Sequence, residues 1–270
     1  MNLFEQAIQQ MLLGNAAQAR QLCEQILYPE NVEPKALHLL GLIAFQEKRH
    51  TEAIDYLSQV LKLQPENADA YFNQGQILLM TQQYVLAEKA FASTLQLVPE
   101  MGQAQLGLGQ ALAYLGQSDA ALLHLKKVIA KRDVLPADDV ALAFLHKGML
   151  YCAQGAHQKA LHCFEQAINL NTWLVLAHYG KAHALRALGR LDEAESSIKP
   201  LFALDDQFAP AYFLFGRLLE KSHQYTEALR CFDRAIFLVP EFSDAIDARD
   251  RILQVLGLHN PARIDKAARG

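Results

Sequence analysis

Cysteine and histidine are the residue types in this sequence with the widest chemistry, because they bind metals and act as nucleophiles or bases. The four cysteines form no CxxC pair, the spacing used by zinc and redox sites; they are Cys23, Cys152, Cys163 and Cys231. The ten histidines form no HxxxH or HExxH motif. We therefore predict small buried thiols and no metal site. The alternative is a metal site assembled from His146, His178 and His183 across neighbouring repeats.

The sequence also lacks the motifs that mark catalytic and cofactor sites. It contains no glycine-rich phosphate loop, no GxSxG elbow and no recognisable catalytic triad. We predict that the chain is not an enzyme and that it binds no cofactor.

Charge and hydropathy argue against two further classes of protein. The chain has 25 Lys and Arg against 29 Asp and Glu, a net charge of −4, whereas a nucleic-acid binder normally carries a basic stripe. No apolar run approaches the ~18 residues that a membrane span requires. The N-terminal segment has no basic region, and Glu5 interrupts its apolar residues, so it does not read as a signal peptide. We predict a cytoplasmic protein, where cysteines stay reduced.

The elements that position these residues are copies of one helix pair, which is clearest at residues 68–101. Its first half has helical spacing at Tyr71, Gln74, Gly75 and Leu78. Its second half has the same period at Leu86, Ala87, Ala90, Phe91, Thr94 and Leu97, and Pro99 then stops the helix. Gly75 and Ala87 are expected where the two helices cross, because small residues let backbones approach closely. A lone pair cannot bury both stripes, so it must stack on copies of itself.

The same positions recur seven times along the chain. The glycine position is occupied by Ala7, Gly41, Gly75, Gly109, Gly148, Ala182 and Gly216. The alanine position is occupied by Ala19, Ala53, Ala87, Ala121, Ala160, Ala194 and Ala228. The large apolar partner is Cys23, Leu57, Phe91, Leu125, Phe164, Ile198 and Phe232. The steps are 34 residues except for one of 39, which marks an insertion around 131–140. We interpret the insertion as a lengthened connection; the alternative is a hinge or contact loop.

At these residues the chain resembles the tetratricopeptide repeat family, whose unit is a 34-residue helix pair with small residues at these two positions and a closing proline. The resemblance implies an all-α fold: a right-handed α-solenoid of seven helix pairs plus a C-terminal capping helix, forming one domain over 1–258. The pairs are expected at about 1–33, 34–67, 68–101, 102–135, 141–174, 175–208 and 209–242. The capping helix is expected at 243–258, with its polar side facing water, and 259–270 is a polar tail. The residues of that polar side are Asp247, Arg249, Asp250 and Arg251.

In this family the concave face of the first helices is the usual peptide-binding surface. That face lies one residue beyond the packing stripe, about 100° round the helix. The candidate groove residues are Phe45, Phe72, Gln76, Met80, Leu106, Gln110, Tyr114, Met149, Tyr179, His183, Arg186, Phe213 and Arg217. Aromatic residues, Met and Arg are enriched where proteins bind one another, and the two arginines suit an acidic group. The alternative is that this stripe packs between neighbouring helices and that the arginines pair with Glu220 and similar neighbours.

Together these features predict a non-catalytic protein–protein interaction scaffold or adaptor that binds a peptide or a helical segment in its groove. The alternative is a substrate-recruiting or regulatory arm of a glycosyltransferase or sulfotransferase whose catalytic domain is absent from this chain. A homodimer contact is a further prediction, because the first helix presents an apolar face made of Leu3, Phe4, Ile8, Met11 and Leu12.

Overall fold

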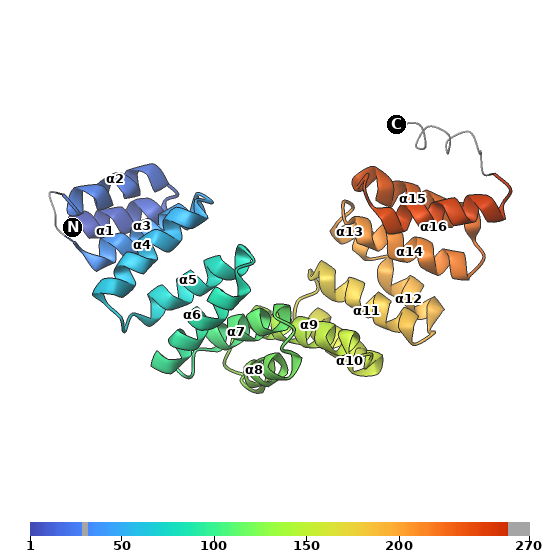
Figure 1. The fold of residues 1–270 in the computed structure, drawn as a ribbon, viewed down its shortest axis with the longest axis horizontal. Helices are drawn as coiled ribbons and strands as arrows, with labels where there is room; N and C mark the ends of the chain where they lie inside the picture. The colour runs from blue at the N-terminus through green and yellow to red at the C-terminus, as the bar shows by residue number, and fades with distance from the viewer. Residues whose placement is uncertain (29–31, 259–270) are drawn as a thin grey trace. The chain divides into compact units, whose positions relative to one another are not determined.

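The computed structural model describes residues 1–28 and 32–258, so the polar tail predicted at 259–270 lies outside the described residues. Within these ranges every regular element is a helix (Figure 1), which confirms the predicted all-α class. The helices are α1 (Leu3–Leu12), α2 (Ala16–Ile26), α3 (Pro34–Gln46), α4 (His50–Leu63), α5 (Ala68–Met80), α6 (Tyr84–Leu97), α7 (Gly102–Tyr114), α8 (Ser118–Ala130), α9 (Ala137–Ala153), α10 (His157–Leu170), α11 (Val175–Ala187), α12 (Leu191–Ile198), α13 (Leu201–Leu204), α14 (Ala209–Lys221), α15 (Tyr225–Leu238) and α16 (Ser243–Val255).

Helices pack on their sequence neighbours, as the repeat predicts. The chain divides into a first unit, Met1–His146, and a second unit, Lys147–Gly270, and the division falls within α9. In the first unit α1 packs on α2, α3 on α4, α5 on α6 and α7 on α8. In the second unit α11 packs on α12 and α14 on α15, and α16 then covers α15. The predicted stack of helix pairs is therefore confirmed.

The glycine and large apolar positions meet directly inside the pairs. A Cβ added at Gly75 would stand 2.9 Å from the Phe91 ring, and one at Gly216 would stand 2.6 Å from Phe232. Such distances are too short for any real Cβ, so glycine lets the two helices approach until the ring fills the space between them. Alanine replaces this glycine only opposite the smaller Cys23 and Ile198.

Two of the phenylalanine rings also touch the next helix pair. A Cβ at Gly107 would stand 2.5 Å from Phe91, and one at Gly180 would stand 2.5 Å from Phe164. Each ring is therefore enclosed by a glycine of its own pair and a glycine of the following one. This arrangement makes the ring a shared core residue of two repeats, as expected where each repeat stacks on its neighbour.

The insertion lengthens a helix as well as a connection. α9 begins at Ala137, directly after Pro136, which is four residues before the expected start of the fifth pair at 141. Proline cannot occupy a helix interior without losing a hydrogen bond, so Pro136 marks the boundary. Asp138 and Asp139 lie in the first turn, where negative charge favours the helix N-terminus.

The second helix of the sixth pair is broken, which the regular spacing does not predict. α12 ends at Ile198 and the four-residue α13 begins at Leu201, with Pro200 between them. Pro200 has no backbone N–H to donate, and its ring clashes with the carbonyl four residues earlier, so one continuous helix cannot form. Ile198 and Leu201 are nevertheless fully buried, so both fragments keep their packing side.

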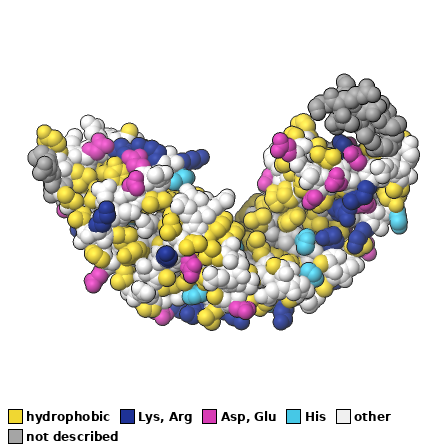
Figure 2. Space-filling model, viewed as in Figure 1, with side chains coloured by type: hydrophobic (Ala, Val, Ile, Leu, Met, Phe, Trp, Pro, Cys, Tyr) yellow, Lys and Arg dark blue, Asp and Glu magenta, His cyan; other side chains and the backbone are white. Residues whose placement is uncertain are grey.

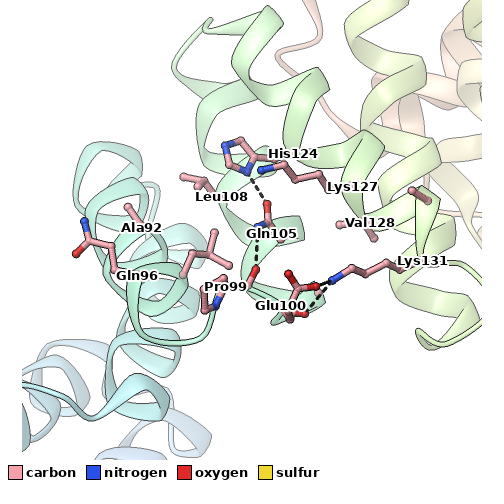
Figure 3. A pocket seen from close by; sticks show the side chains of 13 residues that line it. Ala92, Gln96, Pro99, Glu100, Gln105, Leu108, His124, Lys127, Val128 and Lys131 are labelled. Atoms are coloured by element: carbon pink, nitrogen blue, oxygen red, sulfur yellow. Dashed lines mark hydrogen bonds and ion pairs between the residues drawn. The ribbon is translucent and has the colours of Figure 1, made fainter.

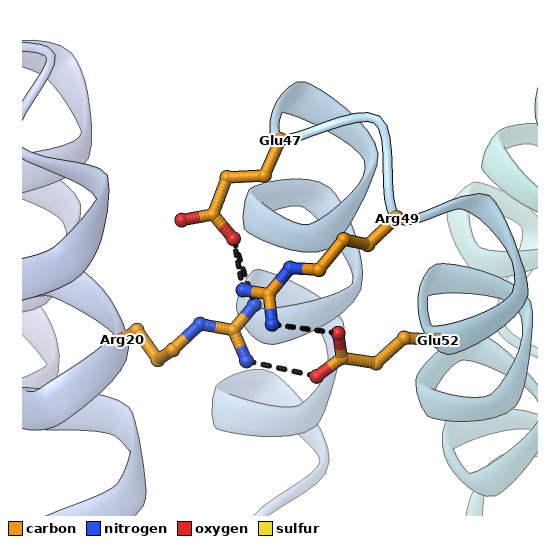
Figure 4. A network of polar contacts seen from close by, with 4 residues as sticks. All are labelled: Arg20, Glu47, Arg49 and Glu52. Carbon is orange, nitrogen blue, oxygen red and sulfur yellow. Dashed lines mark hydrogen bonds and ion pairs between the residues drawn. The ribbon is translucent and has the colours of Figure 1, made fainter.

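An ion-pair network joins the first pair to the second (Figure 4). Arg20 on α2 donates to Glu47 Oε2 at 3.0 Å and to Glu52 Oε1 at 2.9 Å. Arg49 contacts the same two carboxylates. Because the Arg20 side chain is only 14% exposed, its contacts are partly shielded from solvent screening. The network fixes α2 against the turn between α3 and α4.

The cysteines are all free, but they are not equally buried. Cys23 and Cys163 are buried, whereas Cys152 and Cys231 are partly exposed, so the prediction of buried thiols holds fully for only two of them. Burial raises the pKa of both Cys23 and Cys231 to about 11, which keeps these thiols protonated near neutral pH.

Candidate functional site

The first unit contains a pocket of about 380 Å³ on the predicted groove face, here called the first-unit pocket. Six of the candidate groove residues line it: Phe45, Phe72, Gln76, Met80, Leu106 and Gln110. The other lining residues are Leu79, Phe91, Gln103, Gly107, Asp139 and Leu142. They come from α3, α5, α6, α7 and α9, because equivalent first-helix positions of successive repeats face the same side.

The apolar residues of this pocket differ in how much surface they offer. Phe72 is 8% exposed and packs against Phe91 with ring centroids 6.1 Å apart, and Leu106 is 6% exposed. These two side chains therefore form the floor and also belong to the core. Met80 is 64% exposed at the end of α5, so it offers free apolar surface to a ligand.

Tyr114 lies at the end of α7 as part of an aromatic group. Its ring stacks on Tyr84 with centroids 4.6 Å apart. The His146 ring lies edge to face with it, at a centroid distance of 6.4 Å. Burial lowers the pKa of His146 to about 4, so the ring is neutral at pH 7. Its Nε2 lies 3.0 Å from Gln110 Nε2, which can only donate, so His146 accepts this hydrogen bond. Tyr114 is thus held in place while 53% of it stays exposed.

The second unit contains a charged pocket of about 340 Å³, here called the second-unit pocket. Five candidate groove residues line it: Tyr179, His183, Arg186, Phe213 and Arg217. Leu214 of α14 and Asp244, Asp247 and Arg251 of α16 complete it. In Figure 2 basic side chains and histidines cluster on the visible face of this unit.

The arginines of this pocket differ in their partners. Arg217 pairs with Glu220 at 2.9 Å, as the alternative interpretation of the groove stripe predicts for it. Arg186 Nη2 donates to His183 Nε2 at 3.4 Å, while its buried Nε meets no acceptor in the described part of the chain. Burial lowers the pKa of His183 and, more weakly, so does the charge of Arg186, which keeps that ring available as an acceptor. Of the two predicted arginines, Arg186 is the one that has a buried N–H donor without an acceptor.

The capping helix contributes more to this pocket than the sequence predicts. Asp247 and Arg251 were expected on the solvent side of the cap, yet both line the pocket beside Arg186 and Arg217. The periodicity of α16 identifies its polar side correctly. That side lines the second-unit pocket together with residues of α14, instead of facing water alone. Two carboxylates therefore lie among three arginines, and the pocket is mixed in charge.

The remaining predicted residues lie outside both pockets. Met149 on α9 is 43% exposed. On α1, Leu3, Ile8 and Leu12 are 43%, 38% and 82% exposed, whereas Phe4 and Met11 pack partly against the core around Cys23. His178 Nε2 contacts the Thr172 carbonyl oxygen at 3.0 Å. Across residues 1–28 and 32–258, no group of three or more His, Cys, Asp or Glu side chains is placed to hold a metal ion.

A third pocket, of about 610 Å³, was not predicted from the sequence; it is here called the outer pocket (Figure 3). It lies between α6, α7 and α8, on a different side of α7 from Leu106 and Gln110. The buried amide of Gln105 accepts from His124 Nδ1 at 2.6 Å and donates to the Pro99 carbonyl at 3.3 Å. Lys131 pairs with Glu100 at its rim. Its central polar groups already bind one another.

Comparison with known proteins identifies the family. The family model described as "Tetratricopeptide repeat" matches residues 39–102, 84–136, 106–168 and 145–199, which together span more than half of the chain. The chain belongs to the tetratricopeptide repeat family.

The two relatives described next are distant in sequence and longer than this chain. The chain is 23% identical to anaphase-promoting complex subunit 3 of Schizosaccharomyces pombe over 78% of its own length and 31% of that protein. It is 23% identical to the human protein O-mannosyl-transferase TMTC1 over 75% of its length and 22% of that protein. It therefore spans less than a third of either relative. A tetratricopeptide repeat protein from Parabacteroides merdae has the same fold, with a TM-score of 0.70, 17% identity, and 93% and 97% of the two chains covered.

Proposed function

We propose that the protein is a non-catalytic interaction scaffold that binds a peptide or a helical segment of a partner protein along the groove face of its first helices. The observation that carries the proposal is the convergence of separately predicted residues: six line the first-unit pocket and five line the second-unit pocket. Exposed Met80 and Tyr114 supply apolar and aromatic surface of the kind that anchors protein interfaces.

In the second unit we propose Arg186 as the residue that binds an acidic group of the partner. Its buried Nε is already desolvated, so an incoming carboxylate would satisfy it at little further cost. Arg217 is the weaker candidate, because Glu220 already neutralises it.

A pull-down from native lysate with matched variants tests the groove. The groove variant combines Tyr114→Ala and Arg186→Glu, and the control combines Leu123→Ala and Phe237→Ala on the second helices, where both side chains are more than half exposed. We expect the groove variant to lose a partner that the control retains, since an aromatic anchor contributes about 1–2 kcal/mol or more. Retention by the groove variant and loss by the control would place the interface on the second helices.

A second candidate function is a recruiting or regulatory arm of a group-transferring enzyme. The match to an O-mannosyl-transferase over 75% of this chain is the observation that favours it. Reading the gene past the codon for Gly270 tests this candidate: a continuing frame that encodes a transferase domain supports it, and a stop codon with no transferase among the captured partners removes it.

We also propose that the exposed apolar face of α1 can join two copies of the chain. Leu12 is 82% exposed and Leu3 is 43% exposed on that helix. Light scattering at two concentrations, with Leu12→Ser as the variant, tests this: concentration-dependent dimers that the variant lacks support it, and a monomer at both concentrations contradicts it.

A cytoplasmic location completes the proposal, consistent with four free cysteines. No helix in the described ranges is long and apolar enough to cross a membrane.

A further inference from the structure

One carboxylate stands out in the first-unit pocket, because the rest of the lining is apolar or amide. Asp139, in the first turn of α9, lies in the pocket wall with Phe72, Leu106 and Leu142. Its Oδ2 atom is buried and accepts no hydrogen bond from any described residue. A buried acceptor without a donor costs free energy in the unbound protein. A ligand that brings a donor to this atom recovers that cost.

The neighbouring amide adds a second acceptor. Gln110 Nε2 donates to His146 Nε2 at 3.0 Å, which fixes the orientation of the amide and leaves its Oε1 as an acceptor for a ligand. The residues that line this pocket include no Lys, Arg or His, whereas the second-unit pocket is lined by three arginines. The first-unit pocket is therefore negative and rich in acceptors, with an apolar floor.

We propose that this pocket binds one lysine or arginine side chain of the partner segment, with its charged end on Asp139 and its methylene stem over Phe72, Leu106 and Leu142. The inference rests on the proposed groove function and adds the chemistry of one anchor. Long basic side chains combine an apolar stem with a donor-rich end, which matches a floor of this kind beside a carboxylate. A purely apolar anchor would leave Asp139 Oδ2 unpaired, and an acidic anchor would be repelled.

Selection from a phage-displayed library of random peptides tests the inference with the intact protein. The wild type is compared with Asp139→Asn, which keeps the shape and removes the charge. Asp138→Asn is the matched control, because it removes one negative charge from the same helical turn, but Asp138 does not line the pocket. We expect peptides with Lys or Arg beside apolar residues from the wild type and from the control. Synthetic copies of these peptides should bind Asp139→Asn about tenfold more weakly or worse.

A charge-reversal variant, Asp139→Arg, and a groove variant, Tyr114→Ala, distinguish failure of this inference from failure of the proposed groove function. Asp139→Arg should favour peptides with Asp or Glu instead of Lys or Arg. Some peptides could need Tyr114 and yet show no basic preference, or need Tyr114 and bind Asp139→Asn as well as the wild type. Either result would overturn this inference and leave the groove function standing. Peptides indifferent to both Tyr114→Ala and Asp139→Asn, or the recovery of no peptide, would overturn the groove function and this inference together.

Discussion

The contact between Gly75 and Phe91 gives the most quantitative prediction. In Gly75→Ala the new Cβ would stand 2.9 Å from Cδ1 and Cε1 of the ring. The ring is 1% exposed, and its Cζ and Cε1 atoms also lie against Gly107, so it has little room to move away. Overpacking of this kind costs about 1–3 kcal/mol, and replacing a helical glycine by alanine recovers about 1 kcal/mol. We expect a net loss of about 1 kcal/mol.

The chain itself contains the compensating change. In the sixth pair, alanine at position 182 faces Ile198 instead of phenylalanine, and both side chains are fully buried. Phe91→Ile alone should leave a void and cost about 1–3 kcal/mol. In the double variant the new methyl group occupies part of that void. Its total cost should therefore be smaller than the sum of the single costs, by about 1 kcal/mol or more.

Urea unfolding followed by far-UV circular dichroism measures all four proteins. The comparison uses unfolding midpoints at an unchanged dependence on denaturant, so that differences report stability. Single costs that add to within about 0.5 kcal/mol would show that the two residues are not coupled and would refute the packing argument. So would a Gly75→Ala variant that is more stable than the wild type.

Three further predictions concern titration and helix continuity. Hydrogen bonds hold the pKa of Glu47 below its ordinary value, the larger effect coming from Arg49 and the smaller from Arg20. The stabilisation that these bonds give is therefore present above pH ~4.3, and it is lost as the pH falls through the lower folded pKa. The urea midpoint should therefore fall more steeply on acidification for the wild type than for Glu47→Gln, and parallel profiles would contradict this. The folded pKa of His146 is about 4, below its unfolded value of ~6.5, so stability should drop as the pH falls between these values; a ring that titrates near 6.5 by NMR would show that it is not buried. Pro200→Ala should join α12 to α13 and slow amide exchange over 199–204, whereas unchanged exchange would mean that another feature breaks the helix.

The repeat positions made most of the fold predictable, because they encode the contacts between the two helices of each pair that the structure shows. Gly75, Ala87 and Phe91 have types that only a close helix crossing explains, and their recurrence fixes the register of each pair. The helix break at Pro200 is not evident from the repeat pattern, because Ala194 and Ile198 keep the normal spacing before it. A helix break after Ile198, the last repeat position of the sixth pair, does not change the 34-residue spacing.

For the candidate site, the sequence predicts which side of the first helices it occupies, but not which residues line each pocket. Register shows that Gln76 and Gln110 point to the same side of their helices, but it does not show that Asp139 joins them. Asp139 enters the first-unit pocket because the insertion starts α9 four residues early, which no other repeat does. The outer pocket depends on a hydrogen bond between His124 and Gln105, side chains 19 residues apart on different helices. Sequence periodicity carries no information about such a contact.

Site-specific photo-crosslinking shows directly whether a partner protein binds on the groove side of the helix pairs. A photoreactive amino acid replaces Met80 or Tyr114 on the groove side, and Leu123 on α8 serves as the control on the second-helix side, since all three are more than half exposed. We expect that one partner protein is crosslinked from positions 80 and 114 and not from 123, and that the crosslinked residues of the partner form one continuous segment. Crosslinking of that partner from 123 alone would contradict the groove and place binding on the outer side of the helix pairs.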